Sequence, residues 1–190
     1  MRHSTCILFV SDKTDMSEII RTGDNIILRR MNIDDTDNIV RWRNSPIVMS
    51  HFIIRSPLTK EVHKNWIKTK VETGLVEQFI ITIKDSGKEI GSVYFKDIDQ
   101  ASHTAEFGIF IGEESELGKG YGYEAQKLAL DYAFTEMNMK TIILRVLSDN
   151  KAAIANYNKF GFSVMEDKSF VADIEGEEHT VIFMKLVGVN

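Results

Sequence analysis

One stretch of the chain constrains its fold most, because a strand, a glycine-rich turn and a helix follow one another in it. Residues 104–111 form an apolar run typical of a strand, and residues 124–137 have the spacing of an amphipathic helix. The turn between them carries Gly118, Gly120 and Gly122. The first main-chain N–H groups of a helix have no partner inside it, and the helix dipole adds partial positive charge there. Because glycines let a backbone approach an anion without Cβ clashes, the stretch predicts a site for a phosphorylated ligand.

Two common nucleotide-binding motifs do not fit this turn. A P-loop needs four residues between its outer glycines and a hydroxyl after the lysine, but five residues separate Gly112 from Gly118, and Gly120 follows Lys119. A dinucleotide-binding fingerprint needs a third glycine where this chain has Tyr123. The alternative interpretation is a glycine-rich connector that binds nothing.

The composition excludes several classes of protein. The chain has 190 residues, which is enough for one domain with a full core, and its net charge of −5 gives nucleic-acid binding no electrostatic support. The single cysteine, Cys6, excludes an internal disulfide and a cysteine-based zinc site, so we expect no metal. No apolar run is long enough for a membrane span, and no signal peptide is evident. We therefore expect a cytoplasmic protein without a membrane or nucleic-acid partner.

The order of predicted elements indicates an α/β (α+β) fold. Residues 1–24 form an N-terminal extension, and residues 25–190 form one domain with a mixed, mostly antiparallel sheet flanked by about four helices. Strands are predicted over residues 26–31, 78–83, 90–95, 104–111, 141–147, 162–171 and 180–186. Helices are predicted from Asp34 or Asp35 to residue 44, from a Thr59 cap with a stripe of Val62, Trp66 and Val71, over 124–137, and over 150–160.

That order, together with two motifs, resembles the GNAT superfamily of acetyl-CoA-dependent N-acetyltransferases. The turn over residues 117–122 resembles the pyrophosphate loop of the family, and residues 150–162 resemble its motif of asparagine, small residues, tyrosine and Gly-Phe. The resemblance covers roughly residues 26–186, and residues 104–164 are similar to the branch with ribosomal-protein N-terminal and spermidine acetyltransferases. Residues 42–46 also resemble amino-sugar acetyltransferases.

The resemblance implies a set of contacts to acetyl-CoA. Main-chain N–H groups over residues 117–122 are expected to hold the pyrophosphate, and the set comprises Leu117, Gly118, Lys119, Gly120, Tyr121 and Gly122. Leu117 departs from the family, which usually has glutamine or arginine there. The Lys119 side chain either adds charge toward a phosphate or is simply solvated. Phe110 and Ile111, by position, are expected to meet the pantetheine arm and the thioester carbonyl. Asn150 is either a pantetheine contact, a helix cap, or both.

The reaction implied by the resemblance is direct attack of a neutral amine on the thioester. Tyr157 is the candidate general acid for the departing thiolate, and the alternative is a tyrosine that only fills the core. Glu106 is the candidate base, because strand alternation puts its carboxylate on the face opposite Phe107, Ile109 and Ile111; the alternative is a solvent-facing residue. His103, Asp97, Asp99 and a chain of waters remain other candidates for the base.

The acceptor stays open between two chemistries. The resemblance implies that the region of Trp42, Arg43 and Asn44 shapes the acceptor pocket. Trp42 is expected to be a core anchor, whereas nothing about packing requires Arg43 and Asn44, so these two are the candidates to contact the acceptor. An arginine there suits an acceptor with phosphate or carboxylate, such as a nucleotide sugar, and the acidic residues near the fourth predicted strand suit a polyamine. We expect a small-molecule primary amine as substrate, with acetylation of a protein N-terminus as the alternative and a non-catalytic acyl-CoA-binding module as a third possibility. Because homodimers are common in domains of this family, a homodimer is also considered.

Overall fold

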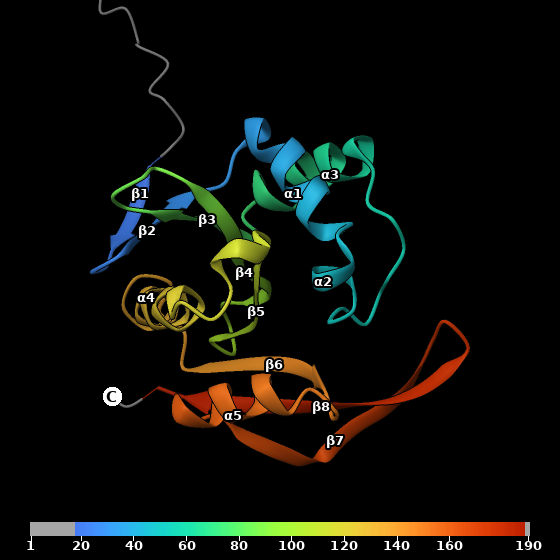
Figure 1. The fold of residues 1–190 in the computed structure, drawn as a ribbon. Coiled ribbons are helices and arrows are strands. Elements are labelled where there is room, and N and C mark those ends of the chain that lie inside the picture. Colours follow the sequence, from blue (N-terminus) through green and yellow to red (C-terminus); the bar gives the residue numbers. More distant parts are fainter. Residues whose placement is uncertain (1–17, 189–190) are drawn as a thin grey trace, which may run out of the picture.

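The protein folds around an eight-stranded sheet with strand order β1-β2-β3-β4-β5-β6-β8-β7, seen in a computed structural model that describes residues 18–188 (Figure 1). Neighbouring strands pair antiparallel except β5 and β6, which pair parallel. The strands are β1 (Ile19–Thr22), β2 (Ile26–Arg30), β3 (Glu77–Ile83), β4 (Glu89–Asp99), β5 (Thr104–Ile111), β6 (Thr141–Leu147), β7 (Ser163–Ile174) and β8 (Glu177–Val187). The predicted fold class, a mixed and mostly antiparallel sheet with flanking helices, is confirmed.

Helices connect these strands and cover the sheet. The α-helices are α1 (Thr36–Arg43), α2 (Pro46–Met49), α3 (Lys60–Trp66), α4 (Tyr121–Thr135) and α5 (Lys151–Lys159). Shorter turns of other helix types are η1 (Ile33–Asp35), η2 (Ile67–Val71) and η3 (Glu114–Glu116). In Figure 1, α1, α2 and α3 lie together on one side of β4, and α4 lies on the other side.

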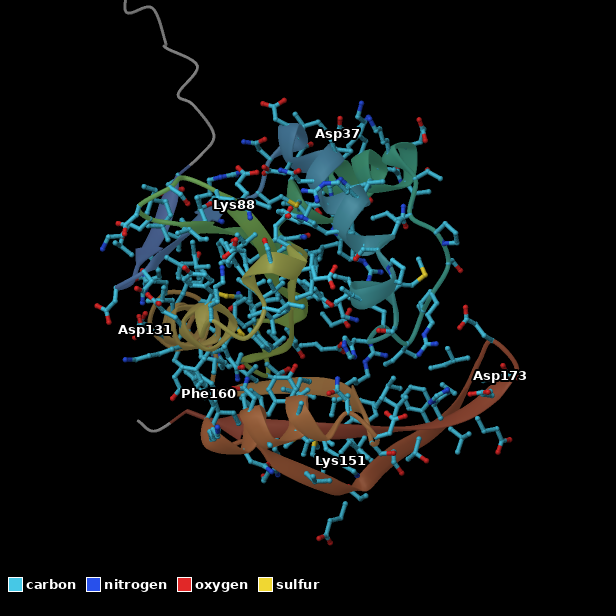
Figure 2. The ribbon with its side chains drawn as sticks, viewed as in Figure 1. Asp37, Lys88, Asp131, Lys151, Phe160 and Asp173 are labelled. Atoms are coloured by element: carbon cyan, nitrogen blue, oxygen red, sulfur yellow. The ribbon has the colours of Figure 1, made fainter. Side chains whose placement is uncertain are left out.

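Helix α4 packs against the sheet through a stripe of small side chains. Ala125, Ala129 and Ala133 are fully buried, and the helix contacts β1, β2, β4 and β5. Figure 2 shows side chains filling the space between α4 and these strands. Because alanines let a helix axis come close to a sheet, α4 holds its N-terminus firmly against the end of β5.

Several predicted elements differ in detail from the structure. Strand β1 was not predicted; it lies in the segment assigned to the N-terminal extension and pairs with β2. Cys6 lies outside the described residues. Asp35 is the N-cap residue of α1, one of the two positions predicted, although its side chain does not cap the helix. The short turn η1 before α1 begins at Asn32, whose side chain accepts from the Asp34 N–H while the Asp35 carboxylate accepts from the Asn32 N–H.

The second and third helical regions also differ from prediction. The sequence predicted only that the first helix ends near residue 44. In the structure a second short helix, α2, follows directly, with Ser45 as its cap and Pro46 as its first residue. The predicted stripe of α3 was wrong at Val62, which is 57% exposed, because the helix turns His63 and Ile67 inward instead. Helix α4 begins at Tyr121, three residues before the predicted start.

Within residues 18–188, no helix is both long and apolar enough to cross a membrane.

Candidate active site

The sheet opens between β5 and β6. These parallel strands pair only where residues 104–106 meet residues 141–143, and beyond Glu106 they have no paired residues. In Figure 1, β6, β8, β7 and α5 accordingly lie together as a unit apart from β1–β5. A strand edge without a partner leaves main-chain donors and acceptors free for a ligand.

Strand alternation decides which main-chain groups of β5 face this opening. The Gly112 N–H donates to the Ile90 carbonyl of β4 at 2.7 Å, and Phe110 and Ser92 are opposite each other in the same register. N–H directions alternate along an antiparallel strand, so the Phe110 N–H points toward β4. The N–H groups of Ile109 and Ile111 therefore point toward the opening.

The glycine-rich turn lies at one end of this opening, at the start of α4. Gly118 and Gly120 have φ values of 74° and 87°, a left-handed conformation that glycine adopts without strain. Within residues 18–188, no main-chain carbonyl accepts a hydrogen bond from the N–H groups of residues 118–122. A row of free N–H groups at the N-terminus of a fifteen-residue helix is a site for an anion.

Two lysines flank the turn and share one carboxylate. Lys119 Nζ lies 2.9 Å from Glu116 Oε2, and Lys88 Nζ lies 2.8 Å from Glu116 Oε1. These hydrogen bonds, Lys119 first, lower the pKa of Glu116 to about 2. Lys119 does not line the cavity described next, whereas Leu117, Gly118, Gly120, Tyr121 and Gly122 do. The turn can therefore hold phosphate oxygens by its backbone, with the lysines held alongside.

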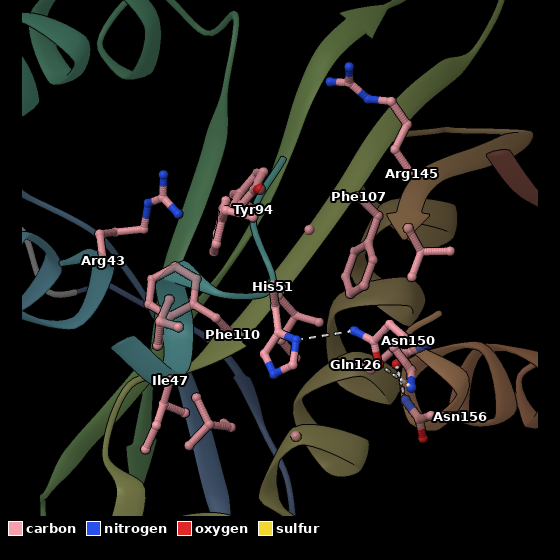
Figure 3. A pocket seen from close by; sticks show the side chains of 18 of the residues that line it. Arg43, Ile47, His51, Tyr94, Phe107, Phe110, Gln126, Arg145, Asn150 and Asn156 are labelled. Carbon is pink, nitrogen blue, oxygen red and sulfur yellow. Dashed lines mark hydrogen bonds between the residues drawn. The ribbon is translucent and has the colours of Figure 1, made fainter. Parts of the chain in front are cut away.

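A cavity of about 910 Å³ connects the turn, the opening in the sheet and the α1–α2 region. Its walls come from α1, α2 and the segment after it, α3, β3, β4, β5, η3, the glycine-rich turn, α4, β6 and α5. Figure 3 shows labelled polar side chains on several of these walls, and they are Arg43, His51, Tyr94, Gln126, Arg145, Asn150 and Asn156.

Glu106 lies on the cavity wall, on the β5 face that the alternation predicted. Phe107, Ile109 and Ile111 pack into the main hydrophobic core, whereas Glu106 contacts Arg145 and Lys96. Arg145 Nε and Nη2 lie 3.0 and 2.9 Å from Glu106 Oε1, and Lys96 Nζ lies 3.1 Å from the same oxygen. Oε2 has no hydrogen-bond partner among residues 18–188, so this oxygen can accept a proton from a ligand.

Tyr157 lies on the α5 wall of the same cavity, in contact with the core. Its ring packs against Phe162, with centroids 5.8 Å apart. Burial, and to a smaller extent the nearby Tyr94 phenol, raises the pKa of Tyr157 to about 12. The phenol therefore stays neutral near pH 7 and can donate a hydrogen bond into the cavity.

Asn150 has a structural role that the sequence indicated. Its side-chain oxygen accepts from the Ala153 N–H at 3.1 Å and so caps α5. Its Nδ2 lies 3.4 Å from His51 Nδ1, across the cavity from α5 (Figure 3). Because Asn150 also lines the cavity, its cap role and a ligand contact are compatible.

The structure separates the two residues predicted to line the acceptor pocket. Arg43 lines the cavity, and its guanidinium carbon lies 3.3 Å from the centroid of the Phe52 ring. Asn44 does not line the cavity, because its side chain pairs with the main chain of Leu58 in both directions at 2.8 Å. Asn44 thereby fixes the segment that follows α2. Trp42 is fully buried, as expected of a core anchor.

The other candidates for the base lie away from the cavity. His103, Asp97 and Asp99 are absent from its walls. Asp99 accepts hydrogen bonds from the Ala101 and Ser102 N–H groups, and His103 Nδ1 contacts the Asn138 carbonyl at 2.9 Å. These contacts are typical of residues that stabilise a turn.

Comparison with known proteins identifies the family. The acetyltransferase (GNAT) domain family matches residues 25–163. The chain belongs to this family. The protein is similar to spermidine N-acetyltransferase of Vibrio cholerae, whose structure was solved in complex with CoA and spermine. The two share 25% sequence identity and superpose with a TM-score of 0.78, over 86% of this chain and 95% of that chain.

Two curated relatives are also acetyltransferases. Spermidine N(1)-acetyltransferase of Escherichia coli (strain K12) is 36% identical over 102 residues, which is 54% of this chain and 54% of that protein. Acetyltransferase PseH of Campylobacter jejuni is 26% identical over 141 residues, covering 74% of this chain and 85% of that protein. The match to the first relative thus spans about half of its length.

The geometry fits the acetyl-CoA that the family uses. Free N–H groups at the turn suit a pyrophosphate, and the unpaired edge of β5 suits an extended arm with amide groups. The GNAT chain is therefore an acetyl-CoA-dependent N-acetyltransferase.

Several cavity residues were missed by the sequence reasoning. Tyr94 lies directly over Gly108, where an added Cβ would come within 2.2 Å of its ring. Arg145 reaches Glu106 from β6, and Asn156 Nδ2 donates to Gln126 Oε1 at 2.8 Å between α5 and α4. Register and packing bring these residues together, so no local pattern in the sequence indicates them.

Proposed function

We propose that this GNAT enzyme transfers the acetyl group of acetyl-CoA to the primary amine of a small molecule, in the class of polyamines and amino sugars. The observation that carries the proposal is a single cavity, which joins the free N–H groups of the turn to a space walled by α1, α2, Glu106 and Tyr157. The similar spermidine acetyltransferases support a small amine as acceptor. A cytoplasmic location and a homodimer stay predictions.

On the cofactor side, we assign the pyrophosphate to the N–H groups of residues 118–122. Ile111, rather than Phe110, is the better donor to the thioester carbonyl, because its N–H points toward the opening. Phe110 instead packs its side chain edge-on against Trp42 and Phe52 and shapes the acceptor side of the cavity. Acetyl-CoA supplies an activated acyl group when it is bound.

The two candidate catalytic residues take complementary tasks. Glu106 Oε2 accepts the proton that the ammonium group must lose before its nitrogen can attack, directly or through one water. Tyr157 donates a hydrogen bond to the sulfur that departs as the amide forms. Both act from opposite walls of the opening, since one lies on β5 and the other on α5.

The test measures cofactor binding and acetyl transfer separately. Calorimetry with CoA should give saturable binding, and thiol release from acetyl-CoA should depend on an added primary amine, with mass spectrometry showing the acetylated product. A Gly176→Ala variant is a suitable control, because its site lies in the β7–β8 turn outside the cavity. CoA binding without acetylation of any polyamine, amino sugar or short peptide would refute the proposed function. Acetylation of peptides alone would move the assignment to protein N-termini.

A further inference from the structure

Arg43 is an arginine without a counter-charge inside the cavity. Its Nη1 is buried and has no hydrogen-bond partner within the described part of the chain, residues 18–188. The guanidinium lies against the ring of Phe52, and Figure 3 shows it beside Tyr94 and Phe110. An arginine keeps its charge even when burial lowers its pKa, as happens at Arg43.

This arrangement sets Arg43 apart from the other arginines among residues 18–188. Each of the others contacts a carboxylate, and they are Arg21, Arg29, Arg30, Arg41, Arg55 and Arg145. A buried charged donor that lacks a partner lowers stability, because the folded protein does not replace the water it has lost. The aromatic contact with Phe52 returns only part of that loss. Such a group is typical of a binding site whose ligand brings the missing acceptor.

The two carboxylates of the cavity also indicate that its ligand carries a negative charge. Its walls contain Glu106 and Glu116, and each already contacts two cations. A polyamine carries further ammonium groups besides the one that is acetylated, and these groups need unpaired carboxylates. Neither carboxylate is free of a counter-charge, so among the residues that the structure describes the unmatched charge on the cavity walls is the positive charge of Arg43.

We infer that the acceptor is a primary amine that also carries a carboxylate or a phosphate group, and that Arg43 binds this anionic group. The inference rests on the proposed transfer of an acetyl group to a small primary amine, and it favours an acceptor with an anionic group over a polyamine. A planar guanidinium can bind either anion through two parallel hydrogen bonds. Arg43 lies on α1, and Glu106 lies on β5, so the anion and the reacting nitrogen occupy different walls of one cavity.

The Tyr94 hydroxyl is a second donor that the anion could use, because Tyr94 lines the same cavity as Arg43 and lies beside it in Figure 3. Burial raises the pKa of Tyr94, and the charge of Arg43 opposes this only in part. The hydroxyl is therefore protonated near pH 7 and can donate a hydrogen bond. Gly108 leaves the space that the Tyr94 ring needs, because any Cβ at that position would overlap the ring.

The experiment compares matched amines that differ by one anionic group. Thiol release is measured with ethanolamine and phosphoethanolamine, glucosamine and glucosamine 6-phosphate, tyramine and tyrosine, and with spermidine. We expect kcat/KM for the anionic member to exceed that of its neutral partner by about 100-fold in at least one pair. Arg43→Gln should reduce this ratio to about 1, mainly through KM, and Arg43→Lys should retain part of it because the charge remains.

A matched control and a binding readout complete the design. Arg41 lies on the same helix as Arg43, but it pairs with Glu113 and does not line the cavity. Arg41→Gln should therefore leave the ratio of kcat/KM between the anionic and the neutral amine unchanged. Inorganic phosphate is also titrated into CoA-saturated protein, where we expect saturable binding that Arg43→Gln abolishes. Thermal unfolding of each variant shows whether it is folded.

The outcomes separate the inference from the proposed function. A preference confined to the phosphate pairs assigns a phosphorylated amine, and one confined to tyrosine assigns an amino acid. Turnover of spermidine or the neutral amines at equal or higher kcat/KM, with ratios unaffected by Arg43→Gln, would overturn the inference and leave the acetyltransferase assignment intact. If no amine is acetylated, the proposed function fails, and the phosphate titration alone decides whether Arg43 binds an anion.

Discussion

Replacing Tyr157 by phenylalanine removes one hydroxyl from the cavity wall and leaves the packing against Phe162 in place. With the pKa of Tyr157 near 12 and that of a thiol near 8.5, complete proton transfer to a free thiolate costs about 5 kcal/mol. We therefore expect Tyr157 to act as a hydrogen-bond donor to the departing sulfur. A hydrogen bond to a charged group contributes about 1.5–3 kcal/mol, so Tyr157→Phe should lower kcat by about 10- to 150-fold.

The assay is steady-state thiol release with saturating amine, together with calorimetry for CoA. The KM for acetyl-CoA should stay within about twofold, because the lost interaction forms only as the sulfur departs. Tyr132→Phe is the matched control, since Tyr132 is buried and its hydroxyl contacts Arg30 outside the cavity. The phenol stays protonated below about pH 11, so Tyr157 should add no basic limb to the wild-type pH profile. A kcat within twofold of wild type, or a basic limb that vanishes in the variant, would refute this reasoning.

Three further predictions concern the turn, the base and a buried histidine. Gly120→Ala should weaken CoA binding by about 10-fold or more, whereas Gly176→Ala, which has the same φ of 87° and equally open surroundings, should lose similar stability and keep its CoA affinity. Equal CoA affinities of the two variants in calorimetry would remove the turn from the cofactor site. Glu106→Gln should lower kcat by about 100-fold or more in the thiol-release assay, and retention of half the wild-type rate would exclude Glu106 as the base. Burial lowers the pKa of His63 to about 4, against 6.5 for an unfolded histidine, so stability should fall as the pH drops from 6.5 to 4 and level off below. Urea unfolding should show that wild type loses about 1–2 kcal/mol more than His63→Asn between pH 7 and pH 5, after allowance for solvent screening, and equal losses would contradict the assignment.

Local patterns accounted for most elements and for the turn. The alternation of apolar residues in β5 correctly put Glu106 on the face opposite Phe107, and the Thr59 cap of α3 is present. The start of α4 was wrong by three residues because Gly120, in a left-handed conformation, caps the helix without a side-chain signal. Val62 was assigned to a buried stripe that the packing of α3 gives to His63 instead.

By itself, the sequence determined the order of most elements, though not β1 or α2, together with the glycine-rich turn before α4 and the family, because each depends on residues that are near one another in the chain. Only the tertiary structure decided which polar groups of the cavity have partners. Strand register brings Glu106 to Arg145 on β6, and the Asn44 side chain bonds to the Leu58 main chain. Arg43 has no carboxylate partner among residues 18–188. Such pairings join residues far apart in the chain, and they arise from packing and desolvation, which no local pattern records.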